Sequence, residues 1–355
     1  MTDFFGQRRP WLVAGPCSAE SEDQMMRTAS GLAACGVSVF RAGLWKPRTR
    51  PGCFEGVGER GIAWLLRVRS EFGMRVCTEV ACASHVSKCL ESGIDMLWIG
   101  ARTTTNPFLV QVIASALEGS DVPVLVKNPV NEDINLWEGA VERLRKSGIS
   151  RIGLVLRGFS HFGKGVYRNI PGWHAAAQMK QAFPDLPILC DPSHISGDAA
   201  LVGELSQRAL DLGLDGLMLE SHFSPENALS DSVQQLTPEA LGVLLGSLKV
   251  RKPDSADAGL DARMASLRSG IDDLDDELLR ILGSRMELCR EIGRCKKDGG
   301  MSILQPARWD GVIRGAVEHG SLYGLDSEFV INLFNIIHSA SIAEQNVILE
   351  NDSEN

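Results

Sequence analysis

Three absences narrow what this protein can be. No apolar run approaches the roughly 20 residues of a membrane-spanning helix, and residues 1–10 lack the apolar core of a signal peptide. A formal net charge of −9 argues against nucleic acid as a partner, because phosphate binding needs a broad basic surface. No Gly-x-Gly-x-x-Gly follows the first predicted strand, so a dinucleotide-binding fold has no support. We expect a cytoplasmic protein without membrane or nucleic-acid partners.

The chain has 355 residues, of which 44% are hydrophobic and 23% are charged, as in soluble globular proteins. Its length fits either one α/β barrel with a smaller addition or two ordinary domains. The nine cysteines are an odd number in a chain with no secretory signal. We interpret them as reduced and mostly buried thiols.

Eight short β-type runs recur in the first part of the chain, separated by segments of helical periodicity such as 62–72 and 136–146. The runs cover residues 11–14, 37–41, 75–79, 96–99, 122–127, 151–157, 187–190 and 216–220. Their spacing of roughly 20 to 40 residues is the size of a βα unit. Eight units in about 250 residues predict an α/β protein with a (β/α)₈ barrel.

The pattern changes after Leu248, where residues 249–259 are rich in Pro, Asp, Ser and Ala. We therefore predict a barrel over residues 1–250, a linker over 251–260 and a helical domain over 261–355. In the last of these, one long amphipathic helix should cover 261–297, with Arg285 on its apolar stripe. Pro306 should lie in the first turn of a second helix, and Asp326 should cap a third running to about residue 350.

The first of these helices would be ~55 Å long at ~1.5 Å per residue. Three helices in some 90 residues cannot cover such a rod by themselves. We expect a second copy of the chain to cover it, which predicts a homodimer built through the helical domain.

Polar residues gather at the carboxyl ends of the eight predicted strands, where a barrel places its active site. They are Cys17, Arg41, Lys46, Arg48, Glu79, Arg102, Lys127, Arg157, His194 and Glu220. Five or six cations converging on one end suit phosphorylated substrates. The thiol, imidazole and carboxylate groups could hold a borderline divalent metal.

Six motifs carry a family resemblance. They are Gly15-Pro16-Cys17-Ser18, Lys46-Pro47-Arg48-Thr49, Gly100-Ala101-Arg102, Leu156-Arg157-Gly158, Asp191-Pro192-Ser193-His194 and Ala228-Leu229-Ser230-Asp231. In order, they resemble those of 3-deoxy-D-arabino-heptulosonate 7-phosphate (DAHP) synthase of the short type I subgroup, over residues 11 to about 245. The resemblance implies a metal-dependent condensation of phosphoenolpyruvate with erythrose 4-phosphate that releases phosphate.

The resemblance also implies roles for individual residues. The metal ligands would be Cys17, His194, Glu220 and Asp231, and the metal would be Mn, Fe, Co or Zn. The phosphoenolpyruvate site would consist of Arg41, Lys46, Arg102, Lys127 and Arg157. Erythrose 4-phosphate would meet Lys46, Pro47, Arg48 and Thr49. Lys46 would be one of the catalytic residues. Proton transfer would be carried out either by Lys127 or by a metal-bound water whose proton Glu79 relays. The sequence leaves that choice open.

A related synthase that condenses phosphoenolpyruvate with arabinose 5-phosphate is the alternative for this domain. It shares the barrel and the phosphoenolpyruvate site but carries an Asn-Arg-Thr-Ser type segment where Lys46-Pro47-Arg48-Thr49 stands here. The two substrates are distinguished by an assay with each aldose phosphate.

The helical domain also brings polar groups to shared faces. Arg285 and Lys296 are eleven residues apart, which is close to three helical turns. Their side chains therefore differ in direction by only about 20° and lie on the same face of the helix. Ser341 and Gln345 lie four apart on the third predicted helix, again on one face. Two cations and two neutral donors facing a helical interior make a plausible pocket for a dicarboxylate.

Residues 267–345 resemble the all-helical chorismate mutase family without a gap. The matching positions are Arg268, Arg285, Lys296, Arg308, Ser341 and Gln345. The resemblance implies rearrangement of chorismate to prephenate, with Arg268 reaching the active site of the other protomer. Arg268, Arg285 and Arg308 would bind the carboxylates, and Lys296 and Gln345 would act on the ether oxygen.

Gln305 and Trp309 stand where that family often has a carboxylate near the substrate hydroxyl, and a tryptophan cannot accept that hydrogen bond. A second interpretation is therefore kept, in which the helical domain is a regulatory module that binds chorismate or prephenate with little or no turnover. Both interpretations allow feedback inhibition of the barrel by prephenate or chorismate.

Overall fold

The structure is a computed structural model that describes residues 10–48, 52–161, 165–251, 258–304 and 306–350. It divides the chain into two compact units, Met1–Pro253 and Asp254–Asn355. Most of the predicted linker, residues 252–257, lies outside the described residues. Among the described residues, no helix has both the length and the apolar character needed to cross a bilayer.

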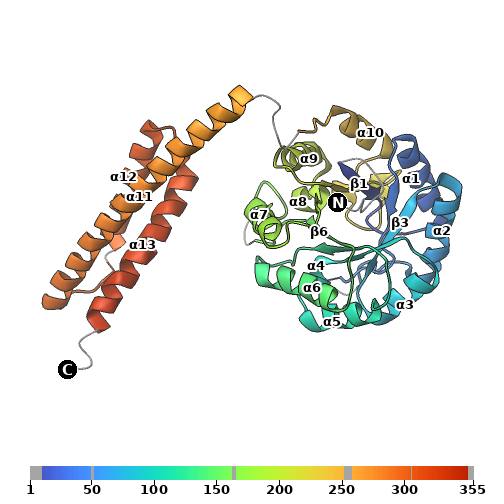
Figure 1. Cartoon of the computed structure of the whole chain (residues 1–355), viewed down its shortest axis with the longest axis horizontal. Coiled ribbons are helices and arrows are strands. Elements are labelled where there is room, and N and C mark those ends of the chain that lie inside the picture. Colours follow the sequence, from blue (N-terminus) through green and yellow to red (C-terminus); the bar gives the residue numbers. More distant parts are fainter. Residues whose placement is uncertain (1–9, 49–51, 162–164, 252–257, 305, 351–355) are drawn as a thin grey trace. The chain divides into compact units, whose positions relative to one another are not determined.

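The first unit is a closed barrel of eight parallel strands in sequential order, β1 to β8 (Figure 1). The strands are β1 Trp11–Gly15, β2 Val39–Arg41, β3 Arg75–Val80, β4 Met96–Ile99, β5 Val124–Lys127, β6 Ile152–Leu156, β7 Ile188–Cys190 and β8 Gly216–Glu220. Pairing of β1 with β8 closes the ring, with Trp11 opposite Gly216 and Gly15 opposite Glu220. The predicted (β/α)₈ barrel is confirmed, and each predicted run overlaps one strand; β1 and β3 extend one residue beyond their predicted ends.

Helices surround this ring (Figure 1). They are α1 Glu22–Ala34, α2 Gly61–Phe72, α3 Ala83–Glu91, α4 Ala101–Thr104, α5 Pro107–Ala116, α6 Ile134–Lys146, α7 Trp173–Ala182, α8 Pro192–Ser196, α9 Val202–Asp211 and α10 Pro238–Ser247. The described residues of this unit also form short 3₁₀ turns, which are η1 Gly58–Arg60, η2 Ala199–Leu201, η3 Pro225–Asn227 and η4 Ser232–Gln234. The larger apolar core lies between strands and helices and includes Phe40, Leu97 and Trp137.

A smaller core fills the inside of the barrel. It consists of Trp11, Val13, Val39, Cys77, Met96, Trp98, Leu125, Val155, Leu189 and Met218. Successive side chains of a strand point to opposite faces of the sheet. The residue two positions after each of these therefore also points inward, closer to the carboxyl end of its strand.

In the described part of the second unit there are three helices, α11 Ala258–Asp298, α12 Pro306–Leu322 and α13 Ser327–Glu350. Pro306 begins α12, and the Asp326 carboxylate accepts a hydrogen bond from the Phe329 amide at 3.0 Å at the start of α13. The predicted helical architecture is confirmed. The first half of α11 exposes its apolar stripe, with Leu267, Ile271 and Leu274 between 56% and 65% exposed.

Candidate active sites

Six charged residues of the barrel each follow a residue of its interior core by two positions. Arg41 follows Val39 in this way, and Lys127 follows Leu125. The same step leads from Cys77 to Glu79, from Val155 to Arg157, from Leu189 to Asp191 and from Met218 to Glu220. The pleat of the strands thus aims charged side chains at the carboxyl end of the barrel interior.

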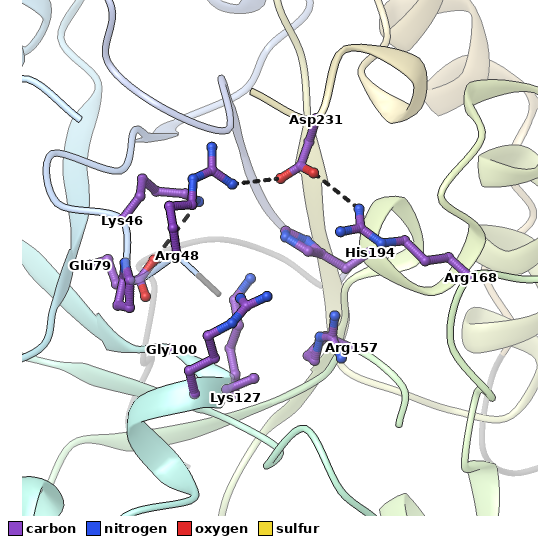
Figure 2. A pocket seen from close by; sticks show the side chains of 12 residues that line it. Lys46, Arg48, Glu79, Gly100, Lys127, Arg157, Arg168, His194 and Asp231 are labelled. Atoms are coloured by element: carbon purple, nitrogen blue, oxygen red, sulfur yellow. Dashed lines mark hydrogen bonds and ion pairs between the residues drawn. The ribbon is translucent and has the colours of Figure 1, made fainter. Parts of the chain in front are cut away.

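Three of these side chains, Glu79, Lys127 and Arg157, line one cleft (Figure 2). Its residues are Lys46, Pro47, Arg48, Glu79, Gly100, Ala101, Arg102, Lys127, Arg157, Arg168, His194 and Asp231. Lys46 to Arg48 come from the segment after β2, and Arg102 from the exposed surface of α4. Thr49, predicted to contact the second substrate, lies outside the described residues.

Arg41 has unused hydrogen-bonding capacity. Its side chain is fully buried, and Nη2 lies 3.1 Å from Glu220 Oε1. Nε and Nη1 have no hydrogen-bond partner among the described residues. Buried donors without partners are rare and costly. Two such donors on a cation fit an anionic ligand.

Two further cations of the cleft are held in buried positions. Lys127 Nζ lies 2.6 Å from Asp191 Oδ2, and burial lowers the pKa of Lys127 although the Asp191 charge opposes this shift. Burial also lowers the pKa of Arg157 to about 10, and its Nη1 donates to Asn169 Oδ1 at 3.2 Å. Arg157 therefore remains cationic at neutral pH and can bind an oxyanion.

Lys46 and Glu79 face each other, with 3.9 Å between Nζ and Oε2. Lys46 Nζ also donates to the Cys17 carbonyl at 3.2 Å. Burial opposes the charge of Lys46, but Cys17, Glu79 and Glu220 together raise its pKa. A Cβ added at Gly100 would lie 2.0 Å from Glu79 Oε1, so only glycine leaves room for this carboxylate.

Cys17, Glu220 and Asp231 form the predicted metal cluster. One donor atom from each lies within 4.8 Å of the other two. His194, the fourth predicted ligand, lies beside this cluster with Nε2 3.7 Å from Glu220 Oε1. Its other ring nitrogen, Nδ1, lies 2.8 Å from the buried Asp191 Oδ2, which fixes the side of the ring that faces Glu220.

The donor set fits a divalent transition metal. A thiol, an imidazole and two carboxylates together suit borderline ions. Burial, followed by the charge of Glu220, raises the pKa of Cys17 to about 12, and its thiol lies 3.1 Å from Asp231 Oδ2. A bound cation would displace this thiol proton, because the thiolate is the ligand.

The helical unit has its own polar cluster. Arg285 Nη1 donates to Ser341 Oγ at 2.6 Å, and Lys296 Nζ donates to Gln345 Oε1 at 3.2 Å and to the Ile303 carbonyl at 2.6 Å. Ser341 and Gln345 are buried, whereas Arg285 and Lys296 are half-buried. Four of the predicted residues thus lie together between α11 and α13.

The other two predicted residues, Arg268 and Arg308, are exposed. Trp309, next to Arg308, stacks on His338 with ring centroids 3.9 Å apart. Burial, then the charges of Arg285 and Lys296, lower the pKa of His338. This imidazole therefore lies near the two cations of the cluster. Gln305 lies outside the described residues.

Comparison with known proteins assigns both units. Residues 4–251 match the DAHP synthetase I family, and residues 267–346 match chorismate mutase type II. The chain belongs to the DAHP synthetase I family. It carries a DAHP synthase domain followed by a chorismate mutase domain, the two catalytic domains of a bifunctional shikimate-pathway enzyme.

Individual relatives match about two thirds of the chain and include DAHP synthases and an enzyme of the related synthase group. The phospho-2-dehydro-3-deoxyheptonate aldolase of Thermotoga maritima is 36% identical over 238 residues, covering 67% of this chain and 68% of the relative. The crystal structure of the Thermotoga maritima DAHP synthase matches with a TM-score of 0.60 at 36% identity, over 66% of this chain and 67% of that one. A 2-dehydro-3-deoxyphosphooctonate aldolase of Wolinella succinogenes is 28% identical over 265 residues, covering 67% of this chain and 97% of the relative.

The sequence interpretation of the DAHP synthase domain missed three polar residues. Asp191 contacts both Lys127 and His194. Its position two residues after the interior Leu189 was a signal that could have revealed it. Arg168 and Gln234 contact Asp231 and Glu220 from loops, where no periodicity points to them.

Proposed function

We propose that the cleft of the DAHP synthase domain binds phosphoenolpyruvate through its buried cations and condenses it with erythrose 4-phosphate. The observation that carries this proposal concerns Nε and Nη1 of the fully buried Arg41, two donors with no hydrogen-bond partner in the described part of the chain. Arg157, Arg102, Lys46 and Lys127 would complete the site around the phosphate and the carboxylate. Guanidinium groups hold such anions in a fixed geometry, which orients the substrate before attack.

Erythrose 4-phosphate would bind at Lys46, Pro47, Arg48 and Thr49. Of these, Figure 2 shows Lys46 and Arg48 on the side of the cleft opposite Arg157. Lys127 and Glu79 are the candidates for proton handling. Lys127 combines a lowered pKa with a buried anionic neighbour. Glu79, whose Oε2 lies 3.9 Å from Lys46 Nζ, would relay a proton to or from a water molecule.

Cys17, His194, Glu220 and Asp231 would hold the divalent cation, with Mn, Fe, Co and Zn all compatible with these ligands. When bound, the cation supplies Lewis-acid polarisation of the aldehyde carbonyl. The protein's part is to orient the four ligands. Asp191 would do so for His194, with 2.8 Å between Oδ2 and Nδ1.

In the helical unit, Arg285 and Arg308 would bind the carboxylates of chorismate, while Lys296 and Gln345 would donate toward the ether oxygen. The rearrangement to prephenate is pericyclic, so catalysis would come from holding the compact conformer and from donors that meet the developing charge. Arg268, which is exposed on α11, would be supplied by the partner in a homodimer.

A second candidate role for the helical unit is regulation by bound chorismate or prephenate, with weak turnover. Trp309, which stacks on His338, supports this regulatory role. An indole at this position cannot accept a hydrogen bond from the substrate hydroxyl, which would weaken turnover. In either case prephenate would inhibit condensation, which requires that it bind two states of the protein with different affinity.

The test measures phosphoenolpyruvate consumption and chorismate turnover in the full chain, with and without chelator and prephenate. Cys17→Ala should abolish metal-dependent condensation and spare the mutase; Arg285→Ala should do the reverse. The exposed Cys53→Ala is the matched control for the first and Arg294→Ala, also exposed on α11, for the second. Full condensation by metal-free Cys17→Ala would overturn the metal site.

Three further measurements complete the test. Turnover of arabinose 5-phosphate in place of erythrose 4-phosphate would favour the alternative synthase activity. Binding of chorismate without turnover would leave the helical unit as a regulatory module. Condensation rates that stay constant at saturating prephenate would overturn the feedback proposal.

A further inference from the structure

A chain of hydrogen bonds runs from the surface of the barrel to the innermost carboxylate of the metal cluster. Arg168 Nη1 donates to Gln234 Oε1 at 2.8 Å, and Gln234 Nε2 donates to Glu220 Oε2 at 2.6 Å. Arg168 lies in the segment between β6 and α7, and Gln234 ends η4. Gln234 is only 1% exposed, so its amide is committed to these two partners.

This chain fixes the orientation of Glu220. Oε1 of that carboxylate is paired with Arg41 Nη2 at 3.1 Å, and Oε2 accepts from Gln234. With one donor on each oxygen, the buried carboxylate cannot rotate about its last bond without losing a hydrogen bond in a low-dielectric interior. Its remaining lone pairs therefore point in a direction that Arg41 and Gln234 set together.

The same arginine also fixes Asp231. Arg168 Nη1 lies 3.0 Å from Asp231 Oδ1, and Arg48 Nη1 approaches Oδ2 at 3.9 Å from the other side (Figure 2). Asp231 has φ 47° and ψ 40°, and it is the one non-glycine residue with positive φ among those described. Such a conformation costs of order 1–3 kcal/mol and persists only where neighbours impose it. Arg168 is one of those neighbours.

We infer that Arg168 and Gln234 are positioning residues that aim the carboxylates of Glu220 and Asp231 at a common cation. This inference rests on the proposed metal site and adds the layer that orients two of its ligands. Loss of such outer partners typically weakens metal affinity by about 10- to 100-fold. The buried Gln234 should matter more than Arg168, whose side chain is 47% exposed and is screened by solvent.

The test is a Co²⁺ titration of the full chain after removal of metal with chelator, followed by the thiolate and ligand-field absorption bands of Co²⁺. Gln234→Met keeps the side-chain volume but neither hydrogen bond, and should raise the Co²⁺ dissociation constant by about 10- to 100-fold and shift the ligand-field bands. Arg168→Met should raise it less, and Arg168→Lys should recover part of the loss.

Arg145→Met is the matched control, because Arg145 also pairs with a carboxylate, Asp185 Oδ2 at 2.6 Å, on the surface of the same domain. It should leave affinity and bands unchanged. If Gln234→Met does not fold, Arg168→Met decides, since an exposed arginine is readily replaced. A purely structural role would lower the metal-free unfolding midpoint and leave the bands of the loaded protein in place, which would overturn the inference.

Cys17→Ala separates this inference from the proposal on which it rests. If Cys17→Ala binds Co²⁺ as the native chain does, the metal site itself is wrong and the inference falls with it. If Cys17→Ala loses Co²⁺ while Gln234→Met and Arg168→Met keep native affinity and bands, the metal site stands and only the positioning role is overturned.

Discussion

Lys127 and Asp191 form a buried ion pair at the carboxyl ends of β5 and β7, with 2.6 Å between Nζ and Oδ2. Asp191 also meets the imidazole of His194, and burial opposes its charge while His194, Lys127 and Arg41 together hold its pKa well below the usual range. One carboxylate therefore links a candidate proton carrier to a candidate metal ligand.

Lys127→Met should abolish condensation and destabilise the barrel by about 3 kcal/mol, because removing one partner leaves a buried charge uncompensated. Asp191→Asn should cost more, since three basic groups then lose their anion. Urea unfolding of the metal-free chain measures this order. Lys180→Met is the control, because Lys180 pairs with buried Asp215 at 3.5 Å but is itself 41% exposed. An Asp191→Asn variant more stable than Lys127→Met would contradict the argument.

Gly100→Ala should reduce condensation far more than it reduces stability. The new Cβ would lie 2.0 Å from Glu79 Oε1, the end of a side chain that can swing away from Lys46. Gly139→Ala in α6 is the control, because no atom lies within 4 Å of its Cβ. That change should stabilise by about 0.5–1 kcal/mol through helix propensity.

A double-mutant cycle makes the Gly100 prediction specific. In a Glu79→Ala background, Gly100→Ala should cause no further loss of condensation activity, because the group it displaces is already absent. Steady-state rates of all four proteins give the coupling. Additive losses would show that the extra methyl group acts elsewhere.

Much of the barrel follows from periodic patterns in the sequence. The eight strands could be predicted because parallel strands buried on both faces form continuous apolar runs, as in 124–127 and 216–220. Arg41, Lys127 and Glu220 were found because each ends such a run. Arg168 and Gln234 could not be found this way, because loop geometry, rather than spacing, brings them to Asp231 and Glu220.

The helical unit shows the same limit. Spacing placed Arg285 and Lys296 on one face of their helix and Ser341 and Gln345 on one face of another, since a helix repeats its faces regularly. That the two faces meet was expected from the family resemblance. The contact of Trp309 with His338 joins two different helices, and its register depends on how α12 packs against α13. Helix periodicity alone does not determine that register.

The uncovered stripe of α11 predicts that the chain dimerises. Leu267, Ile271 and Leu274 are 61%, 56% and 65% exposed and lie on one helix face. Single exposed apolar residues are common on protein surfaces, but a contiguous exposed apolar stripe marks an interaction surface. Ile271→Glu combined with Leu274→Glu should therefore yield a monomer in light scattering and lose mutase activity, because the partner's arginine is then missing. Ser269→Glu, on the opposite face of the same exposed segment, should remain dimeric. A native chain that is monomeric at micromolar concentration would contradict the prediction.

His338 should titrate below its ordinary pKa of about 6.5. Burial comes first among the causes, followed by repulsion from Arg285 and Lys296 on α11. As the pH falls from about 6.5 toward the lower pKa of the folded state, the folded state binds fewer protons than the unfolded state. The free energy of unfolding therefore decreases across that pH window and levels off below it. His338→Phe keeps the ring on Trp309 and should remove this dependence. Histidine NMR titration of the full chain, with His338→Phe assigning the resonance, measures the pKa directly. Trp309→Ala should move it back toward the ordinary value by admitting water, and a native value above 6.5 would show that the two cations do not reach the imidazole.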